Sequence, residues 1–249
     1  MSTSTLEPIL VVSDAHIPYH NAKAFNLMIQ AAKAIKPKHI YIIGDFLDFY
    51  AVSSHSKDPN RAVKLVEELK AGEAELDTLD ALGATHKTFI AGNHCDRLQR
   101  YLQDKAPELF NIVNVPELLH LKRRGWDYVP YKHDTKLGKL YLTHDVGVAG
   151  RNSVFRCLDT YQHSIVTGHS HRMAYIVEGN AIGEFKLSAQ FGWLGDASKV
   201  DYMHHAKVLK DWALGFGVGY YDPASKYVYM TPVPIVNQTC VVNGKLFKG

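Results

Sequence analysis

The chain has 249 residues, of which 46% are hydrophobic and 21% are charged, and its formal net charge is +3. This composition excludes fibrous and disordered proteins, and a chain of this length can bury a large core without disulfide support. No apolar run approaches the roughly 18 residues that span a bilayer, and no basic or apolar leader is visible. Together with three cysteines at unrelated spacings, this predicts free thiols, a cytoplasmic location and no membrane partner.

The first part of the chain predicts alternating strands and helices. Short, β-branched apolar runs predict buried strands at 8–14, 38–45 and 86–92. Helices are expected at 22–35, at 61–82 and from about Asp96. The leucines of the second helix recur at four-, seven- and three-residue steps and therefore share one face. This order of elements predicts a parallel sheet with right-handed crossovers.

The second part of the chain consists mostly of strand-like runs. Such runs occur at 126–131, 139–145 and 164–170, and one helix is expected at 151–161. Beyond Arg172 four more runs follow, and the sequence DPAS between the last two is a hairpin turn signal. A mixed sheet, or two sheets packed face to face with helices outside, fits this pattern better than a purely parallel fold.

Five of the predicted strands end in polar motifs. In α/β sheets the loops after the carboxyl ends of the strands form the functional crevice, so these motifs are expected to converge. Taken singly, each residue is more often a helix cap, a turn residue or a surface side chain, but five in succession favour a site. The motifs are SDAH (Asp14, His16), GDFLD (Asp45, Asp48), GNHCD (Asn93, His94), THD (His144, Asp145) and GHSH (His169, His171).

The side chains of these motifs form a set of oxygen and nitrogen donors. Carboxylate and imidazole groups suit divalent first-row ions and do not suit copper(I). Seven candidate ligands are too many for one tetrahedral zinc, and they fit two ions that share a bridging carboxylate. That arrangement acts on phosphoryl substrates. We expect two divalent metal ions, with Mn favoured and with Fe, Zn, Ni and Co also compatible.

The ordered motifs from Asp14 to His171 resemble those of the calcineurin-like metallophosphoesterase superfamily: D-x-H, G-D-x-x-D, G-N-H-[D/E], H and G-H-x-H. The compact chain is similar to small microbial or bacteriophage members. The resemblance implies a four-layer α-β-β-α sandwich with two mixed β-sheets. We expect a single domain of residues 1–249, in which 1–172 forms the metal-site core and 173–249 completes the second sheet.

The resemblance also implies a role for each residue. His94 would protonate the leaving group, and Asp48 would orient or charge-stabilise its imidazole. The implied activity is hydrolysis of phosphate mono- or diesters, of nucleotides or nucleic acid, by direct attack of a metal-bridging water. Asn93, His94 and Arg97 are the expected substrate contacts. One metal would be held by Asp14, His16, Asp45 and His171, and Asp45 would bridge to a second metal completed by Asn93, His144 and His169.

Some positions depart from the pattern of the superfamily. Phe49 and Ala91 stand where its Ser/Thr protein phosphatases carry phosphate-gripping arginines, which argues against a protein phosphatase. Arg97, Arg151 or Arg172 could take their place. In addition, Cys95 is expected to pack near the site, and Asp145 to add a carboxylate beside the ligands.

The identity of the substrate is weakly encoded. The basic and aromatic run at 121–126 is compatible with a nucleic-acid strand, but a solvated helix end is the favoured interpretation. The segment 201–212 is either a lid over the site or a surface helix. Three functions stay open: a phosphoesterase acting on small nucleotides or monoesters, an Mre11-like DNA nuclease, and a metal-free scaffold like the retromer subunit. The intact ligand set weighs against the scaffold.

Overall fold

The larger sheet of the protein has six strands and mixed direction. The computed structural model describes residues 5–54, 57–58, 63–199 and 211–249. The first four strands in chain order are parallel neighbours, and two late strands add to the β1 edge in antiparallel fashion. The six strands are β1 (Glu7–Val12), β2 (His39–Ile43), β3 (His86–Ile90), β4 (Asp127–Val129), β10 (Gly215–Tyr221) and β11 (Val228–Pro234).

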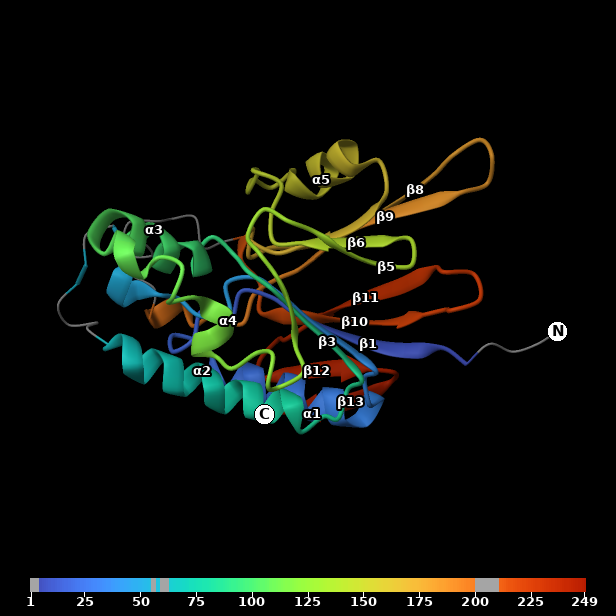
Figure 1. The fold of residues 1–249 in the computed structure, drawn as a ribbon. Helices are drawn as coiled ribbons and strands as arrows, with labels where there is room; N and C mark the ends of the chain where they lie inside the picture. Colours follow the sequence, from blue (N-terminus) through green and yellow to red (C-terminus); the bar gives the residue numbers. More distant parts are fainter. Residues whose placement is uncertain (1–4, 55–56, 59–62, 200–210) are drawn as a thin grey trace.

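The smaller sheet has five strands in the order β5-β6-β7-β9-β8. Its three central strands are parallel, and the two edge strands are antiparallel to their neighbours. Helix α5 (Ser153–Tyr161) connects β6 to β7 and lies over the outer face of this sheet (Figure 1). The strands are β5 (Thr135–Leu137), β6 (Leu140–Thr143), β7 (Ser164–Thr167), β8 (Met173–Gly179) and β9 (Phe185–Phe191).

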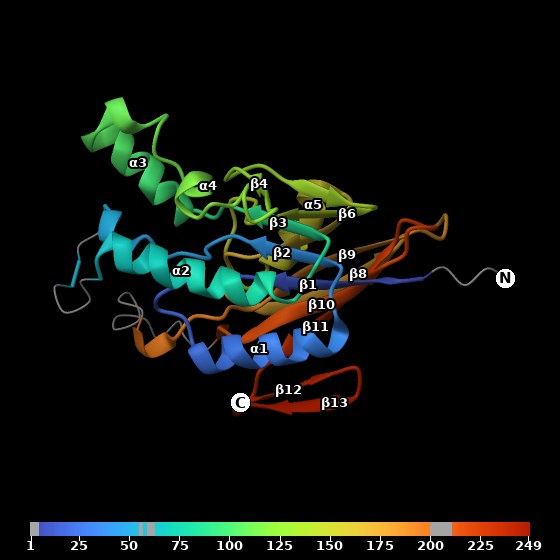
Figure 2. The same cartoon turned by 60° about the horizontal axis from the view of Figure 1, so that its bottom comes forward.

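Helices α1 (Ala22–Ile35) and α2 (Leu65–Asp80) cover the other face of the larger sheet (Figure 1). Helix α1 begins where the Asn21 side chain accepts a hydrogen bond of 3.0 Å from the Ala24 N–H, and it ends at Lys36 in the left-handed region. A hairpin of β12 (Thr239–Val242) and β13 (Lys245–Lys248) covers α1 from outside (Figure 2). Shorter elements occupy the loops: η1 (Tyr50–Val52), α3 (Cys95–Lys105), η3 (Pro107–Leu109), α4 (Val115–Leu118) and η4 (Ala197–Lys199).

The apolar core has two parts because the larger sheet is buried on both faces. In β1, Leu10 and Val12 pack with the helices, whereas Ile9 and Val11 belong to the cluster between the two sheets. Successive side chains of a strand point to opposite faces, so one apolar run supplies both layers. This explains why the sequence shows continuous apolar strands instead of alternating ones.

The expected α/β architecture of helix, sheet, sheet and helix layers is confirmed. The segment 173–249 divides differently from the expectation: only β8 and β9 join the smaller sheet, β10 and β11 extend the larger one, and β12–β13 stands apart. The helix expected at 61–82 is α2, Leu65–Asp80, and residues 59–62 lie outside the described part. Among the described residues, no helix is long and apolar enough to cross a membrane.

Candidate metal centre

The five polar motifs follow β1, β2, β3, β6 and β7 and meet where both sheets end. Backbone hydrogen bonds join the loops: the Asp14 N–H donates to the Gly44 carbonyl at 3.2 Å, and the Gly168 N–H donates to the His144 carbonyl at 2.9 Å. The two sheets are linked by His144, whose Nδ1 donates to the Ile43 carbonyl at 2.9 Å. Parallel strands thus bring residues more than a hundred positions apart to one rim.

The backbone at this rim adopts conformations that L-residues seldom take. Each non-glycine residue in the left-handed region costs about 1 kcal/mol or more, so such a group persists only where its surroundings determine it. Two glycines allow the close approach: a Cβ on Gly44 would lie 2.0 Å from His144 Nδ1, and a Cβ on Gly92 would lie 2.1 Å from Asp45 Oδ1. Five candidate ligands have positive φ: Asp14 (50°), His16 (54°), Asp45 (45°), His169 (65°) and His171 (56°).

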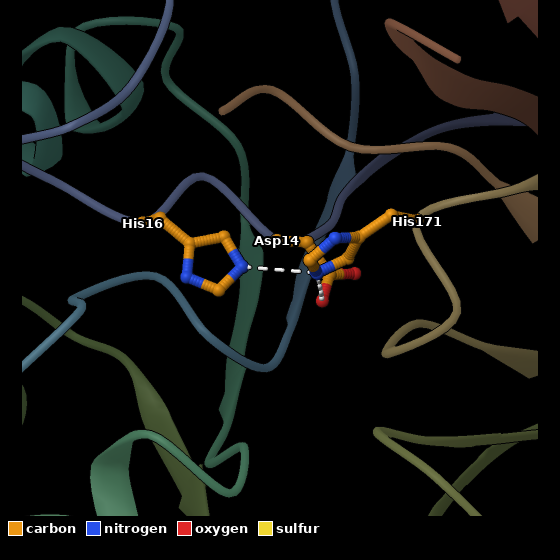
Figure 3. Close-up of side chains that lie close together, drawn as sticks. All are labelled: Asp14, His16 and His171. Carbon is orange, nitrogen blue, oxygen red and sulfur yellow. Dashed lines mark hydrogen bonds and ion pairs between the residues drawn. The ribbon is translucent and has the colours of Figure 1, made fainter. Parts of the chain in front are cut away.

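The first half of the centre contains Asp14, His16 and His171. Figure 3 shows their polar atoms pointing toward one another, those of Asp14 and His16 from the loop after β1 and those of His171 from the loop after β7. His16 Nε2 and His171 Nε2 are 3.1 Å apart, and His171 Nε2 is 3.3 Å from Asp14 Oδ1. All three residues are buried. The Ser13 hydroxyl and the His169 N–H donate to the Asp14 carboxylate and fix its orientation.

The second half contains Asp45, Asn93, His144 and His169. Asn93 Oδ1 lies 2.9 Å from His144 Nε2 and 3.0 Å from His169 Nδ1. Asp45 Oδ2 is 3.3 Å from His144 Nε2, while its Oδ1 accepts the His94 N–H at 2.8 Å. The seven side chains expected as ligands therefore lie together at one rim.

The charges of the centre are strongly coupled. Burial raises the pKa of Asp45, but the charges of His144 and His94 and a hydrogen bond with His144 outweigh it and hold that pKa well below its ordinary value. Burial lowers the pKa of His144, yet the Asp45 and Asp14 carboxylates raise it to about 10. Burial lowers the pKa of both His169 and His171, and in His169 the charge of His144 adds to this effect. Ionised carboxylates thus surround two imidazoles that are held neutral, His169 and His171, and a protonated His144, whose second proton a bound cation would replace.

The orientation of His144 tests whether a cation fits. Its Nδ1 faces a backbone carbonyl, which can only accept, so the hydrogen of the neutral ring sits on Nδ1. Its Nε2 lone pair then points at oxygens of Asp45 and Asn93, which are acceptors as well. A proton or a cation must lie between these three atoms, and a divalent ion satisfies them all. His16 repeats the pattern, because its Nδ1 donates to Asp48 Oδ2 at 3.2 Å and its Nε2 faces His171.

The expected acid–base residues lie beside the ligands. His94 Nδ1 donates to the Asp48 carbonyl at 3.0 Å and lies 3.4 Å from Asp48 Oδ2. Burial raises the pKa of Asp48, but its contacts with His16 and His94 hold it below the ordinary value. Arg97 NH1 donates to Asp48 Oδ1 at 3.1 Å, and its NH2 lies 2.9 Å from His94 Nε2. Asp48 therefore orients the candidate ligand His16 as well as His94.

The structure adds groups that the sequence reasoning missed. Glu68 of α2 is fully buried, and its Oε1 accepts the Phe49 N–H directly after Asp48. The sequence contained a signal that Glu68 is buried, because Glu68 lies three residues after Leu65 and therefore on the apolar face of α2. Trp193 and Trp212 pack around His171. No motif marked these tryptophans, since their position depends on tertiary packing.

Other predicted residues fall in different places. Arg172 lines a cavity of about 290 Å³ together with Asp45, His94, His169 and His171, whereas Arg151 is exposed. Cys95 is buried at the start of α3. Asp145 Oδ1 accepts the Gly147 N–H at 2.8 Å and is not among the clustered ligand groups.

The basic and aromatic run at 121–126 does not form part of this cavity. Arg124 pairs with Asp77 and Asp80 on α2, and Trp126 Nε1 donates to Asp80 at 2.8 Å. These contacts fix the loop before β4 to the end of α2 and give the run a structural role. The segment 201–212, for which a lid and a surface helix were both left open, lies outside the described residues apart from Asp211 and Trp212.

Comparison with known proteins identifies several similar proteins and one family. The Gene 54 protein of Mycobacterium phage L5 is 23% identical over 255 residues, covering 96% of this chain and 98% of that protein. Vacuolar Protein Sorting 29 from Cryptosporidium parvum has 13% identity and a TM-score of 0.49, over 97% of this chain and 94% of its own. The Pseudomonas putida nuclease MPE has 16% identity and a TM-score of 0.40, over 90% and 87%. The model of one family, calcineurin-like phosphoesterase, matches residues 7–221, and the chain belongs to that family.

Proposed function

We propose that the protein is a two-metal phosphoesterase that hydrolyses phosphate mono- or diesters. The observation that carries the proposal is that two donor groups contain six of the expected ligands: the buried Asp14–His16–His171 and the largely buried Asp45–His144–His169. A third group, His16–Asp48–His94, joins the first group to the proton donor. In each, the ligand atoms lie within 4.8 Å of one another. Asn93 Oδ1 adds a neutral oxygen to the second group. Divalent cations bound there would supply the positive charge that activates water and neutralises phosphate oxygens.

The residues of the chain would hold the reacting groups in place. The carboxylates of Asp14 and Asp45 are oriented by backbone N–H donors, so they need little reorganisation when they bind cations. His94 is the proton donor to the leaving oxygen. Its Nδ1 is tied to the Asp48 carbonyl, so Nε2 is the nitrogen that delivers the proton.

The arginines of the site would bind the phosphate. In the described structure Arg97 NH2 lies 2.9 Å from His94 Nε2, where it occupies the position of the proton. A phosphate anion would attract this guanidinium and release His94 Nε2 for protonation. Arg172 lines the same cavity, and its buried Nε has no hydrogen-bond partner among the described residues. Both arginines would take the place of those absent at Phe49 and Ala91.

The experiment is metal analysis with turnover of small phosphate esters. Purified protein is loaded with Mn(II), Ni(II) or Zn(II), and metal content and hydrolysis of a mono- and a diester panel, including DNA, are measured. We expect close to two metals per chain and metal-dependent turnover that Asp45→Asn and His171→Ala abolish. His163→Ala, an exposed histidine at the opposite end of β7, is the control. If the protein neither takes up metal nor hydrolyses any ester, the result would favour the scaffold. DNA cleavage with strong salt dependence would favour the nuclease.

A further inference from the structure

A cluster of aromatic rings forms one wall of the candidate metal centre. The rings of His171 and Trp193 are stacked, with centroids 5.0 Å apart and an interplanar angle of 11°. Trp212 is 4.1 Å from His171 and 4.9 Å from Trp193, at angles of 78° and 69°. Trp212 is close to both stacked rings and nearly perpendicular to both. Its ring therefore lies beside the stack, against the edges of the two stacked rings. Trp212 is therefore held by a metal ligand and by a second indole.

The wall is built into the fold. Trp193 is only 3% exposed, and its backbone N–H donates to the Ala213 carbonyl at 3.0 Å. Gly195 lies directly against the indole, because a Cβ there would be 2.1 Å from Trp193 Cζ3. Leu214 packs on the same cluster. An indole fixed in this way holds Trp212, which is only partly buried, in place from behind, so that Trp212 loses little conformational entropy when a ligand packs on it.

Trp212 lines two cavities. One, of about 290 Å³, contains the ligands Asp45 and His171 and the proton donor His94. The other, of about 220 Å³, is lined by Trp193, Trp212 and Leu214, with Asn21 and Asp196 as polar groups. A phosphate held by the metals in the first cavity would direct its ester group past Trp212. The group that leaves with the proton of His94 would thus contact this wall.

The chemistry of the second cavity indicates which ester group fits. Its apolar lining is largely indole, which stacks on flat rings and gains less from a short alkyl chain. Asp196 Oδ1 accepts hydrogen bonds from the N–H and the hydroxyl of Ser198, and its Oδ2 pairs with Lys199 at 3.4 Å. The remaining lone pairs of this carboxylate can accept hydrogen bonds from ring N–H or amino groups, and they offer no donor to a further phosphate. A nucleoside satisfies both conditions, whereas a polyphosphate or a sugar phosphate does not.

We propose that Trp212 and Trp193 form the binding wall for the leaving group, and that this group is a nucleoside. The inference rests on the proposed phosphoesterase function and names its substrate class. Water forms a new bond to phosphorus, the bond from phosphorus to the nucleoside oxygen breaks, and that oxygen takes the proton. The products are a nucleoside and inorganic phosphate, or a nucleotide where the substrate is a diester.

Two measurements test the wall, one of them without catalysis. In the first, kcat/KM is compared between a nucleoside monophosphate and glycerol phosphate for the wild type, Trp212→Leu and Trp212→Phe. We expect the ratio of the two kcat/KM values to fall about tenfold in Trp212→Leu, mainly through KM, and to recover in part in Trp212→Phe. Tyr229→Leu, which removes an aromatic ring that is 50% exposed on β11, should leave the ratio unchanged.

In the second, adenosine, which has no phosphate, is titrated into the protein as purified, and tryptophan fluorescence is recorded. We expect saturable binding that Trp212→Leu weakens about tenfold and Tyr229→Leu preserves. If Trp212→Leu lowers kcat/KM equally for both esters, so that the ratio of the two values is unchanged, Trp212 only supports His171. That result would overturn the inference. Absence of adenosine binding would overturn it as well. Failure of the proposed phosphoesterase function can be distinguished from failure of this inference. In that case the wild type would hydrolyse neither ester, while the adenosine titration would still show whether the tryptophan wall binds a nucleoside.

Discussion

The buried carboxyl group of Glu68 leads us to expect an unusual dependence of the free energy of unfolding on pH. Its side chain is fully buried in α2; Oε1 accepts the Phe49 N–H, and Oε2 has no hydrogen-bond partner among the described residues. Burial raises the pKa of Glu68, the hydrogen bond from the Phe49 N–H and the charge of Arg97 oppose this, and the Asp48 carboxylate adds to it, so that the pKa rises from 4.5 to about 8. The folded protein therefore keeps Glu68 neutral at pH 7, while the unfolded chain ionises it.

The sign and size of the effect follow from proton linkage. Below about pH 4.5 the carboxyl is neutral in both states, so burial carries no ionisation penalty. Between 4.5 and 8 the unfolded state loses its proton and the folded state does not, so stability falls as pH rises. At about 1.4 kcal/mol per pH unit, the total approaches 5 kcal/mol and levels off above pH 8.

Glu68→Gln removes this titration and keeps an oxygen that accepts the Phe49 N–H. We expect its advantage in unfolding free energy over the wild type to be about 4 kcal/mol larger at pH 8.5 than at pH 5. The assay is urea unfolding followed by far-UV circular dichroism across this range, with a chelator present so that metal binding does not contribute. The control is Glu67→Gln, at an exposed neighbouring position on the same helix. Its unfolding free energy should depend on pH in the same way as that of the wild type.

If the difference in unfolding free energy between the wild type and Glu68→Gln stayed constant from pH 5 to pH 8.5, this reasoning would be refuted. That result would mean that Glu68 is ionised in the folded protein and held by a cation, with Arg97 the nearest candidate. A change in the dependence of unfolding free energy on urea concentration would instead indicate an altered unfolded state.

Three further predictions concern the centre. His94→Ala should keep its metal content and lower kcat about 100-fold or more; metal analysis with kinetics checks this, and a full rate across pH would remove the acid role. Gly92→Ala places a Cβ 2.1 Å from Asp45 Oδ1, so metal uptake and melting temperature should fall, whereas Gly150→Ala, with nothing within 4 Å, should change neither. Because the pKa of Asp48 is depressed, its ionised form stabilises the fold above its ordinary pKa. Asp48→Asn should therefore be less stable at pH 7, with a deficit that shrinks below about pH 4 in acid unfolding; a pH-independent deficit would contradict this.

The strand ends show why so much of the site was readable in advance. Asp14, Asp45 and Asn93 each follow a strand whose apolar run is continuous, and such strands are parallel and buried. Parallel neighbours end at one edge of a sheet, so a polar residue after each apolar run is placed in space by local sequence alone. The α1 helix, Ala22–Ile35, was readable for a similar reason, since its cap and its end are local signals.

The late strands were not readable to the same degree. The runs at 215–222 and 226–234 predict strands and their hairpin, but nothing local distinguishes the β1 edge of the larger sheet from the smaller one. That choice depends on burying Phe216 and Val218 against partners distant in the chain. The assignment of all of 173–249 to one sheet failed for this reason.

The sequence by itself determined the donor types, their order and their place at the ends of strands, because these depend on residue identity and on the period of the apolar pattern. Tertiary structure alone decided that Asp48 serves both His16 and His94, that Glu68 is buried behind it, and that two indoles enclose His171. Such contacts arise between segments whose separation is set only when layers pack. No local propensity encodes the distance between them.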